Sequence, residues 1–406
     1  MPRIAIIGAG IAGVTCAYEL AADGHEVHVF ERRGSVAAEA SFANAGTIAP
    51  ALALPWTRPG FGFGWAGRQW KAARHPAAAE RAERALHLAV YSHQRLQTLR
   101  RALQLDFESA EGQLVLLREK ADCQAIAPGL ERLAKLGLVA RELDAEQCLA
   151  AEPGLNAETK LAGGIKLPLA EVGNCRQFAH LLRMEAQKLG ARFHFHTTVR
   201  SLQAGGQLSH EHTPHEESQG AASRMTDAGD TEPQASGLQH ETFDAVIVCA
   251  ALESAALLGP RLGRQLGLKP VLAHSVTAPL RQLEAHPDLG PRGGLLDLHL
   301  GVSLSRIGQR VRATGPNEAV LHQALHDWFP GASVSTQSQR WSGAHAMLAD
   351  NLPLIGASGL ARVWLNLAHG DAGWTLACGA ARVLAESVAG LKPEVDITGL
   401  DASRLA

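Results

Sequence analysis

The chain has 406 residues, 46% of them hydrophobic and 19% charged, which is enough for two or three folding units with sizeable cores. Its formal net charge of -2 argues against a nucleic-acid partner, because phosphate binding depends on a surplus of lysine and arginine. No apolar run approaches the ~18–20 residues of a membrane-spanning helix, so no transmembrane span is expected.

Six cysteines occur singly, without the close spacing of a zinc knuckle or a redox dithiol. This pattern favours free thiols in a reducing compartment and predicts a cytoplasmic protein. Peripheral contact with the inner face of the membrane stays open. The histidines at 210, 212 and 215 lie in a polar stretch without paired cysteines, so no metal site is predicted.

The first thirty residues predict a strand, a helix and a second strand. Residues 3–7 form a short, continuous apolar run typical of a buried parallel strand. Apolar residues recur at helical spacing over 11–22, before Asp23-Gly24, and they alternate over 25–30. Together the three segments predict a right-handed βαβ unit.

The turn between the first strand and the helix carries three glycines at fixed offsets. Gly8 permits a tight turn, Gly10 allows a pyrophosphate to approach the backbone, and Gly13 allows the helix to pack closely on the sheet. The backbone of Ile11 and Ala12 supplies free N–H groups at the positive end of the helix. The pattern predicts a dinucleotide-binding site.

Glu31 ends the second strand, 21 residues after Gly10, where its carboxylate is placed to accept hydrogen bonds from an adenosine ribose. Arg32 and Arg33 follow it. The two arginines could provide surface charge, or they could favour the 2′-phosphate of NADP. The fingerprint alone leaves FAD and NAD(P) open.

The rest of the chain alternates helical and strand patterns around one polar insertion at 204–241. Helices are predicted at 77–105, 131–136, 145–151, 176–189, 319–329 and 374–389. Strands are predicted at 113–117, 192–195, 198–199, 243–250 and 363–366, with several antiparallel strands within 271–312. The insertion is expected to be exposed and mobile.

A second glycine-rich strand–turn–helix lies near the carboxyl end, from Asn366 to Thr375. Small residues cover much of the following helix, which allows a backbone or a flat ring to approach closely. The start of such a helix stabilises the negative charge of a reduced flavin, so this turn favours FAD.

Several motifs resemble the D-amino-acid dehydrogenase small subunits of the glycine oxidase and D-amino-acid oxidase superfamily. They are Ser-Phe-Ala-Asn-Ala-Gly at 41–46, Pro-Trp at 55–56, His-Gly at 369–370, Gly-Trp-Thr at 373–375 and Ala-Cys-Gly at 377–379. The similarity covers nearly the whole chain outside the insertion.

The resemblance implies an α/β fold in which a discontinuous, Rossmann-like FAD-binding domain carries a substrate domain with a mixed, largely antiparallel sheet. The FAD-binding domain is expected at 1–80, 155–255 and 338–406, and the substrate domain at 81–154 and 256–337. The implied reaction is oxidation of a D-amino acid to an imino acid, by hydride transfer to flavin N5, and hydrolysis to a 2-oxo acid and ammonia.

The same resemblance implies contacts between the chain and FAD. The cofactor-contacting residues would be Ser41, Asn44, Ala45, Gly46, Val199, Ala250, Gly356, Gly370, Gly373, Trp374 and Thr375. The family's strand-end pattern is an alanine followed by a glycine, and here it is Ala250-Ala251.

The sequence departs from the family at the substrate-binding arginine, whose position is taken by His345. A guanidinium holds a carboxylate through two parallel bonds, whereas a histidine offers one ring N–H. The substrate could therefore be an amine or an N-substituted amino acid, or another arginine, such as Arg292 or Arg306, could hold the carboxylate. His345 and His369 are the candidate catalytic residues, because histidine titrates near neutrality.

The residues alone leave the electron acceptor and two alternative functions open. The electron acceptor is expected to be oxygen, a quinone or a redox partner. An NAD(P)-dependent dehydrogenase and a catalytically silent FAD-binding subunit remain as alternative functions.

Overall fold

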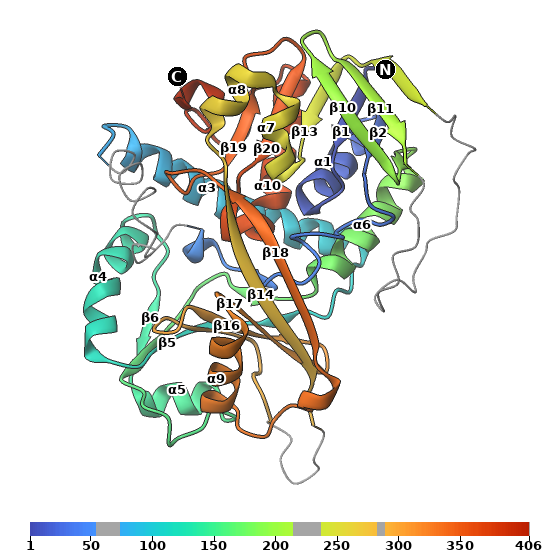
Figure 1. Cartoon of the computed structure of the whole chain (residues 1–406). Helices are drawn as coiled ribbons and strands as arrows, with labels where there is room; N and C mark the ends of the chain where they lie inside the picture. Colours follow the sequence, from blue (N-terminus) through green and yellow to red (C-terminus); the bar gives the residue numbers. More distant parts are fainter. Residues whose placement is uncertain (54–73, 214–236, 282–288, 406) are drawn as a thin grey trace.

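A computed structural model describes residues 1–53, 74–213, 237–281 and 289–405. Figure 1 shows two regions: a sheet flanked by helices, and a second region built on a larger sheet. Both chain termini lie in the first region (Figure 1). The long strands β14 and β18 run between the two regions (Figure 1). The expected Pro-Trp motif at 55–56 and His215 lie outside the described residues.

The first region is built on a six-stranded sheet in the order β19-β20-β13-β1-β2-β9, parallel except for β19. Its strands are β1 (Arg3–Ile7), β2 (Glu26–Phe30), β9 (Arg192–His194), β13 (Ala245–Val248), β19 (Leu354–Ala357) and β20 (Val363–Leu367). The four last residues of β1, β2 and β13 are all buried, as expected for parallel strands covered on both faces.

Helices cover one face of this sheet. They are α1 (Ile11–Ala22), α3 (Ala78–Leu103), α6 (Cys175–Lys188) and α10 (Gly373–Val388). Helix α10 packs against both α1 and α3. The small residues expected on α10 permit this packing, since a Cβ at Gly379 would lie 2.7 Å from Cβ of Ser92 in α3.

The opposite face is covered by a small antiparallel sheet and two short helices. They are β10 (Thr197–Gln203), β11 (Gln207–His212), β12 (Leu238–Thr242), α7 (Ser254–Leu257) and α8 (Gly259–Leu266). Their apolar side chains form one core cluster with β1, β13 and β20. The first region is therefore a three-layer, doubly covered α/β sheet.

The second region is a mixed sheet in the order β18-β14-β17-β16-β15-β5-β7-β6, in which only β5 and β15 pair in parallel. Its strands are β5 (Gln113–Leu117), β6 (Arg141–Leu143), β7 (Gly163–Lys166), β14 (Lys269–Pro279), β15 (Gly294–Asp297), β16 (Val302–Ile307), β17 (Arg310–Gly315) and β18 (Gln339–Met347). The expectation of a mixed, largely antiparallel sheet is confirmed.

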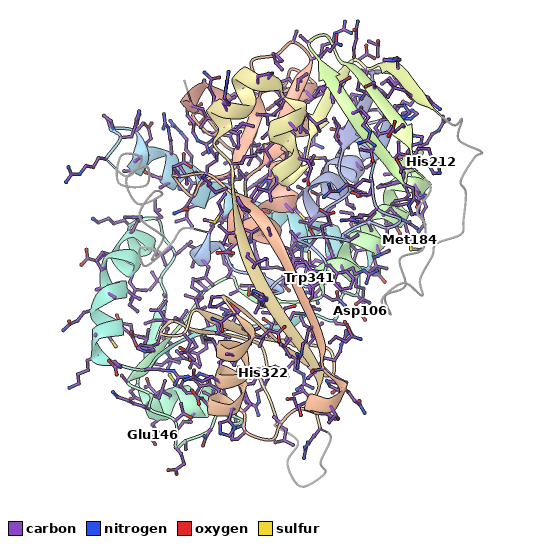
Figure 2. The ribbon with its side chains drawn as sticks, in the orientation of Figure 1. Asp106, Glu146, Met184, His212, His322 and Trp341 are labelled. Atoms are coloured by element: carbon purple, nitrogen blue, oxygen red, sulfur yellow. The ribbon has the colours of Figure 1, made fainter. Side chains whose placement is uncertain are left out.

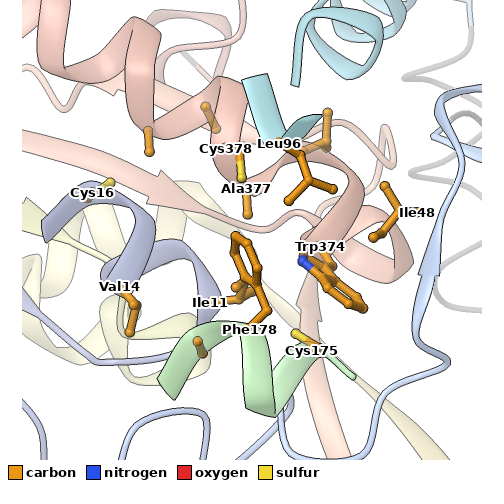
Figure 3. Close-up of a cluster of buried hydrophobic side chains, with 14 of the residues drawn as sticks. Ile11, Val14, Cys16, Ile48, Leu96, Cys175, Phe178, Trp374, Ala377 and Cys378 are labelled. Atoms are coloured by element: carbon orange, nitrogen blue, oxygen red, sulfur yellow. The ribbon is translucent and has the colours of Figure 1, made fainter. Parts of the chain in front are cut away.

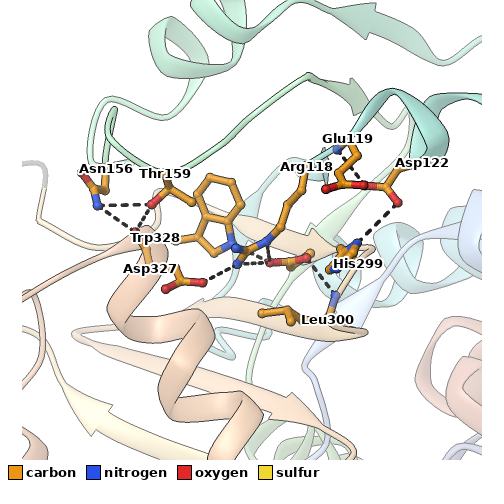
Figure 4. A network of polar contacts seen from close by, with 10 residues as sticks. Arg118, Glu119, Asp122, Asn156, Thr159, His299, Leu300, Asp327 and Trp328 are labelled. Atoms are coloured by element: carbon orange, nitrogen blue, oxygen red, sulfur yellow. Dashed lines mark hydrogen bonds and ion pairs between the residues drawn. The ribbon is translucent and has the colours of Figure 1, made fainter.

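Helix α9 (Glu318–Trp328) covers the apolar face of this sheet. A buried polar network joins them, because the fully buried carboxylate of Asp297 accepts hydrogen bonds from Arg118 Nε at 2.8 Å and Trp328 Nε1 at 2.7 Å. Arg118 also bonds Asp327, and its guanidinium lies over the Trp328 ring (Figure 4). Each buried charge in this network has an opposite charge beside it.

Smaller elements complete the described chain. They are β3 (Thr47–Ile48), β4 (Ala110–Glu111), β8 (Glu171–Val172), α4 (Lys120–Lys135), α5 (Ala145–Ala151), and the 3-10 turns Pro50–Leu52, Ala251–Glu253, Ser335–Gln337, Gly370–Ala372 and Ala402–Leu405. Strands β3, β8 and β4 form a second small sheet.

Three segments make long-range contacts across the expected domain boundaries. Strand β7 falls in the expected FAD-binding part and β18 in its last segment, yet both pair within the second sheet. Helix α3 falls largely in the expected substrate part, yet it packs on α10. Local patterns do not report which distant strand or helix a segment meets.

Two local expectations are also corrected. The insertion is shorter than 204–241, because both of its ends are strands, β11 and β12, that pair with each other. Helix α4 begins at Lys120 rather than at 131, although Pro128 lies within it. No helix of the described residues is long and apolar enough to span a membrane.

Candidate functional site

The predicted site residues gather mainly at one edge of the six-stranded sheet, where the parallel strands end. Gly8 follows β1, Ala250 follows β13, and the turn at 368–373 follows β20. Because β13 lies between β1 and β20, the three strand ends are neighbours. The carboxyl edge of a parallel sheet is the usual ligand-binding edge of this kind of fold.

The three opening glycines are each explained by geometry. Gly8 has φ +101°, and a Cβ there would lie 2.8 Å from the carbonyl oxygen of Cys249. At Gly13 a Cβ would lie 1.9 Å from the Gly8 oxygen, so the helix could not approach the strand. Gly10 is less crowded, because a Cβ at this position would have Ser41 Oγ as its nearest neighbour, at the ordinary contact distance of 3.6 Å. Its open side suits the approach of a ligand.

Glu31 is fixed by two backbone donors at the end of β2. Its carboxylate accepts hydrogen bonds from Ala9 N at 2.7 Å and Arg33 N at 2.8 Å. Burial raises the pKa of Glu31, against the effect of these two bonds. Arg32 forms surface ion pairs with Glu39 and Glu253.

The segment at 41–49 joins the starts of two helices. The amide of Ile11, at the first turn of α1, donates to Ser41 Oγ at 3.1 Å. The amide of Ala49 donates to Oγ1 of Thr375, in the first turn of α10, at 3.2 Å. The N-cap residues Gly10 and Ala372 provide no capping side chain, so first-turn amides other than that of Ile11 are left as donors for a ligand.

The same segment lies against the eight-stranded sheet. The ring of Phe42 stacks on Trp341 of β18 with centroids 6.4 Å apart. The carbonyl oxygen of Asn44 accepts a bond from Arg312 of β17, and that of Ala45 accepts one from Ser305 of β16. Trp341 lies where β18 passes between the two regions (Figure 2).

Gly46 follows the residues of this segment that contact the eight-stranded sheet. Its φ is +73°, and a Cβ at this position would lie 2.6 Å from the Gly173 oxygen, so the site has room only for glycine. The side-chain oxygen of Asn44 accepts a hydrogen bond from the Gly46 amide at 3.1 Å. The predicted residues at 41–46 therefore lie between the two regions in a fixed backbone conformation.

His369 begins the turn that leads into α10. Its Nε2 lies 2.8 Å from Oδ1 of Asn366, and the Asn366 amide nitrogen contacts Cys16 Sγ in α1 at 3.1 Å. Burial lowers the pKa of His369 to about 4. The imidazole is therefore neutral at pH 7, and Nε2–H donates to Asn366 while Nδ1 keeps a lone pair.

His345 lies on β18 near the same turn. Its Nε2 is buried and lies 3.2 Å from Oδ1 of Asp371, within ion-pair distance but not aligned for a hydrogen bond. Of the alternative arginines, Arg306 donates to the carbonyl of Gly308 and to Gln309 within its own hairpin. Arg292 has its backbone amide bound to Glu152.

Trp374 is placed with its ring in the core rather than exposed at the turn. The indole packs near Phe178, with ring centroids 6.0 Å apart (Figure 3). The ring of Phe107 also lies near it, with its centroid 5.8 Å away. Its Nε1 is buried and finds no hydrogen-bond partner in the described part of the chain. Gly370, with φ +55°, packs near Met347, and a Cβ at Gly373 would lie 3.8 Å from Cβ of His369.

Two predicted cofactor residues lie apart from this edge. Val199 lies on β10 in the small sheet, opposite His210 and beside an irregularity in strand pairing. Gly356, with φ +124°, lies on the edge strand β19 and faces Asp401. Sequence reasoning missed Ser305, Arg312 and Trp341, whose signal was polar and aromatic residues alternating with apolar ones along strands.

Comparison with known proteins defines the class of protein. The family model described as FAD dependent oxidoreductase matches residues 3–387, and the chain belongs to that family. A D-amino acid dehydrogenase of Cereibacter sphaeroides is 34% identical, with alignment covering 100% of this chain and 95% of the relative. A D-amino acid dehydrogenase of Rhizorhabdus wittichii is also 34% identical, over 99% of this chain and 100% of the relative.

Solved structures agree on the fold. Glycine oxidase from Geobacillus kaustophilus superposes with a TM-score of 0.72 at 18% identity, covering 100% of this chain and 99% of that one. The α/β fold with mixed sheets is thus confirmed, and the protein is an FAD-dependent oxidoreductase. The residues fit the cofactor: Gly10 leaves its approach open, the N-cap residues Gly10 and Ala372 provide no capping side chain, and the buried Trp374 Nε1 is unsatisfied among the described residues.

Proposed function

We propose that this protein oxidises the C–N bond of a D-amino acid, giving an imino acid that hydrolyses to a 2-oxo acid and ammonia. The observation that carries the proposal is the segment at 41–49, which joins the first turns of α1 and α10 through Ser41 and Thr375. The names of the full-length relatives support the D-amino acid as the substrate.

The opening glycine turn would hold the ADP half of FAD, and the turn at 370–375 would hold the flavin. Gly8, Gly10 and Gly13 would shape the first contact, with the amide of Ala12 directed at the pyrophosphate and Glu31 at the ribose, whereas the amide of Ile11 is already bonded to Ser41 Oγ. Bound FAD supplies a hydride acceptor at flavin N5.

The reaction requires positioning more than acid–base chemistry. The substrate loses a hydride from Cα and a proton from its amine, and water then adds to the C=N bond and expels ammonia. His369 is neutral and bonded to Asn366, so its role would be to hold the turn and offer a lone pair, not to act as a cation. His345 would lie at the margin of the site, beside Asp371.

The direct test is anaerobic reduction of the flavin. Purified protein should be yellow, and a panel of D-amino acids should bleach its flavin absorbance, whereas the L-enantiomers, N-methyl amino acids and simple amines should bleach it at least ~10-fold more slowly. A protein that is yellow but not bleached by any D-amino acid would contradict the proposal.

Gly10→Val tests the cofactor assignment separately. Gly10 has φ -66°, and its side is open, so a valine should be accommodated by the protein but should obstruct the nucleotide. We expect a folded variant without flavin absorbance. Arg33→Gln is the control, because the side chain pairs only with Glu39 on the surface among the described residues, and it should retain the flavin.

We infer that the electrons leave to an acceptor other than oxygen, since the relatives are named dehydrogenases. Turnover should therefore reduce a quinone or an artificial dye faster than it consumes oxygen. The six free cysteines support a cytoplasmic location. Fractionation of cells producing the protein would test that location and any association with the membrane.

A further inference from the structure

The eight-stranded sheet has one face that is polar and yet buried. Side chains alternate along a strand, so residues paired across strands share a face. One such row crosses five strands: Thr277, Arg312, Ser305, Gly294 and Gln113. All but the glycine are polar, and each of these polar residues is at most 7% exposed. The opposite face forms the apolar core under α9.

Arg312 lies at the centre of this polar face. Its Nε donates to Thr277 Oγ1 at 2.9 Å, and its Nη1 donates to the carbonyl oxygen of Asn44 at 3.1 Å. Within the described residues no acceptor is found for Nη2, so donors of the guanidinium remain free. The side chain is 6% exposed, and both of its partners are neutral.

Among the described residues no carboxylate forms a hydrogen bond or ion pair with Arg312, and only Glu108 lies near enough to interact with its charge. The nearby carboxylate of Glu108 is bound to Arg310 at 2.5 Å and to Asn174 at 2.7 Å. The Cys175 thiol is neutral, because burial raises its pKa to about 12. A buried cation without a partner is costly, which points to an anion supplied from outside the chain.

The surroundings of Arg312 are suited to a polar ligand. Buried hydroxyls of Ser275 and Thr314 lie one row along the same face, and neither finds a hydrogen-bond partner in the part of the chain described. The Asn44 carbonyl that Arg312 holds belongs to the segment at 41–49, which links the two helix N-termini. The free charge thus lies beside the proposed flavin-binding segment.

His345 and Arg312 lie at separate positions of the sheet. His345 pairs with Val271 of β14, and Arg312 pairs with Thr277 of the same strand. Six residues of extended chain separate these two backbone positions, which corresponds to about 20 Å along the strand. Arg312 is therefore a candidate contact distinct from His345.

We propose that Arg312 binds the carboxylate of the substrate, and that the substrate must therefore be an anion at this position. The inference rests on the proposed amino-acid oxidation and specifies its substrate class: an amino acid with a free carboxylate, not a simple amine. Arg312 replaces, from a different strand, the carboxylate contact that His345 does not provide.

The test compares holoenzyme variants on matched charged and neutral ligands. Arg312→Met and Arg312→Lys are measured with the best D-amino acid of the bleaching screen and with its amide. Propionate and propionamide are titrated as unreactive probes, with perturbation of the flavin spectrum as the readout. Arg306→Gln is the matched control, because that side chain is bound within its own hairpin.

We expect Arg312→Met to lose about 100-fold or more in kcat/KM for the amino acid and in affinity for propionate, with little change for the amide and propionamide. Arg312→Lys should recover part of the loss, since it restores the charge without the planar fork. Arg306→Gln should behave as wild type.

Three results would overturn the inference. They are an Arg312→Met variant that still prefers the acid to its amide, one that loses FAD instead of carboxylate affinity, and an Arg306→Gln variant that shows the larger loss. If the wild-type holoenzyme is not bleached by any amino acid, the proposed function fails, whereas propionate binding still tests the anion site by itself.

Discussion

The two faces of the eight-stranded sheet bury arginines in different ways. On the side of α9, Arg118 contacts two carboxylates, and the fully buried Asp297 also accepts a bond from Trp328. On the other side, Arg312 contacts only a hydroxyl and a carbonyl oxygen. A face that serves stability compensates its charges internally, whereas a face that binds a ligand leaves a charge for the ligand to compensate.

The largest contrast should appear in stability. Asp297→Ala leaves Arg118 and the Trp328 N–H without their buried acceptor, and should lower the free energy of unfolding by about 3–5 kcal/mol. Arg312→Met removes an uncompensated charge and should change it by less than about 1 kcal/mol. Urea unfolding of FAD-saturated protein without substrate measures both. Equal losses in the two variants would show that Arg312 is structural.

Two neighbouring residues of β14, one on each face of the sheet, test the same difference between the apolar and the polar face. Val276 is 1% exposed on the apolar face, and Ser275 is 1% exposed on the polar face. Val276→Ser buries an unpaired hydroxyl and should cost about 1–3 kcal/mol. Ser275→Val removes a hydroxyl that is already unpaired and should be nearly neutral, measured by the same unfolding transition. A large loss in Ser275→Val would indicate a hydrogen bond to that hydroxyl.

Buried histidines provide a smaller, pH-dependent effect in the first region. Burial lowers the pKa of His369 and of His194 from 6.5 to about 4, so the unfolded chain binds these protons first. Their effect is absent above pH 6.5, and stability falls as the pH drops from 6.5 towards 4, by about 1–2 kcal/mol for each at pH 5. His369→Asn should remove its share of the difference between pH 7 and pH 5. An unchanged pH dependence would contradict the lowered pKa.

The smallest effect is expected at an exposed arginine. Arg32 is 38% exposed in its side chain and pairs with Glu39 and Glu253. Arg32→Gln should therefore cost at most about 1 kcal/mol of unfolding free energy. Its FAD content, measured from the flavin-to-protein absorbance ratio, should match that of wild type. Loss of the flavin would assign Arg32 to the cofactor instead of the surface.

Much of the nucleotide-binding region could be predicted from local pattern. The bounds of β1, α1 and β5 match their predicted ranges, and the roles of Gly8 and Gly13 follow from their offsets. Strands β11 and β12 are not predicted by the sequence, because their mostly polar residues resemble those of an insertion without secondary structure. The predicted site was incomplete for the same reason: histidines near glycine turns were visible, whereas Arg312 is an ordinary residue in an alternating strand.

Sequence patterns alone were enough to predict the βαβ unit, the glycine turn, the FAD-dependent class and the kinds of strands present. These features depend on residues close together in the chain, where periodicity, turn geometry and helix ends act directly. Three-dimensional contacts were needed to establish that β18 pairs with β14, that residues 41–49 join two helix N-termini, and that Arg312 is buried without a carboxylate bonded to it. Compensation of a charge depends on neighbours far away in sequence, which a local pattern does not specify.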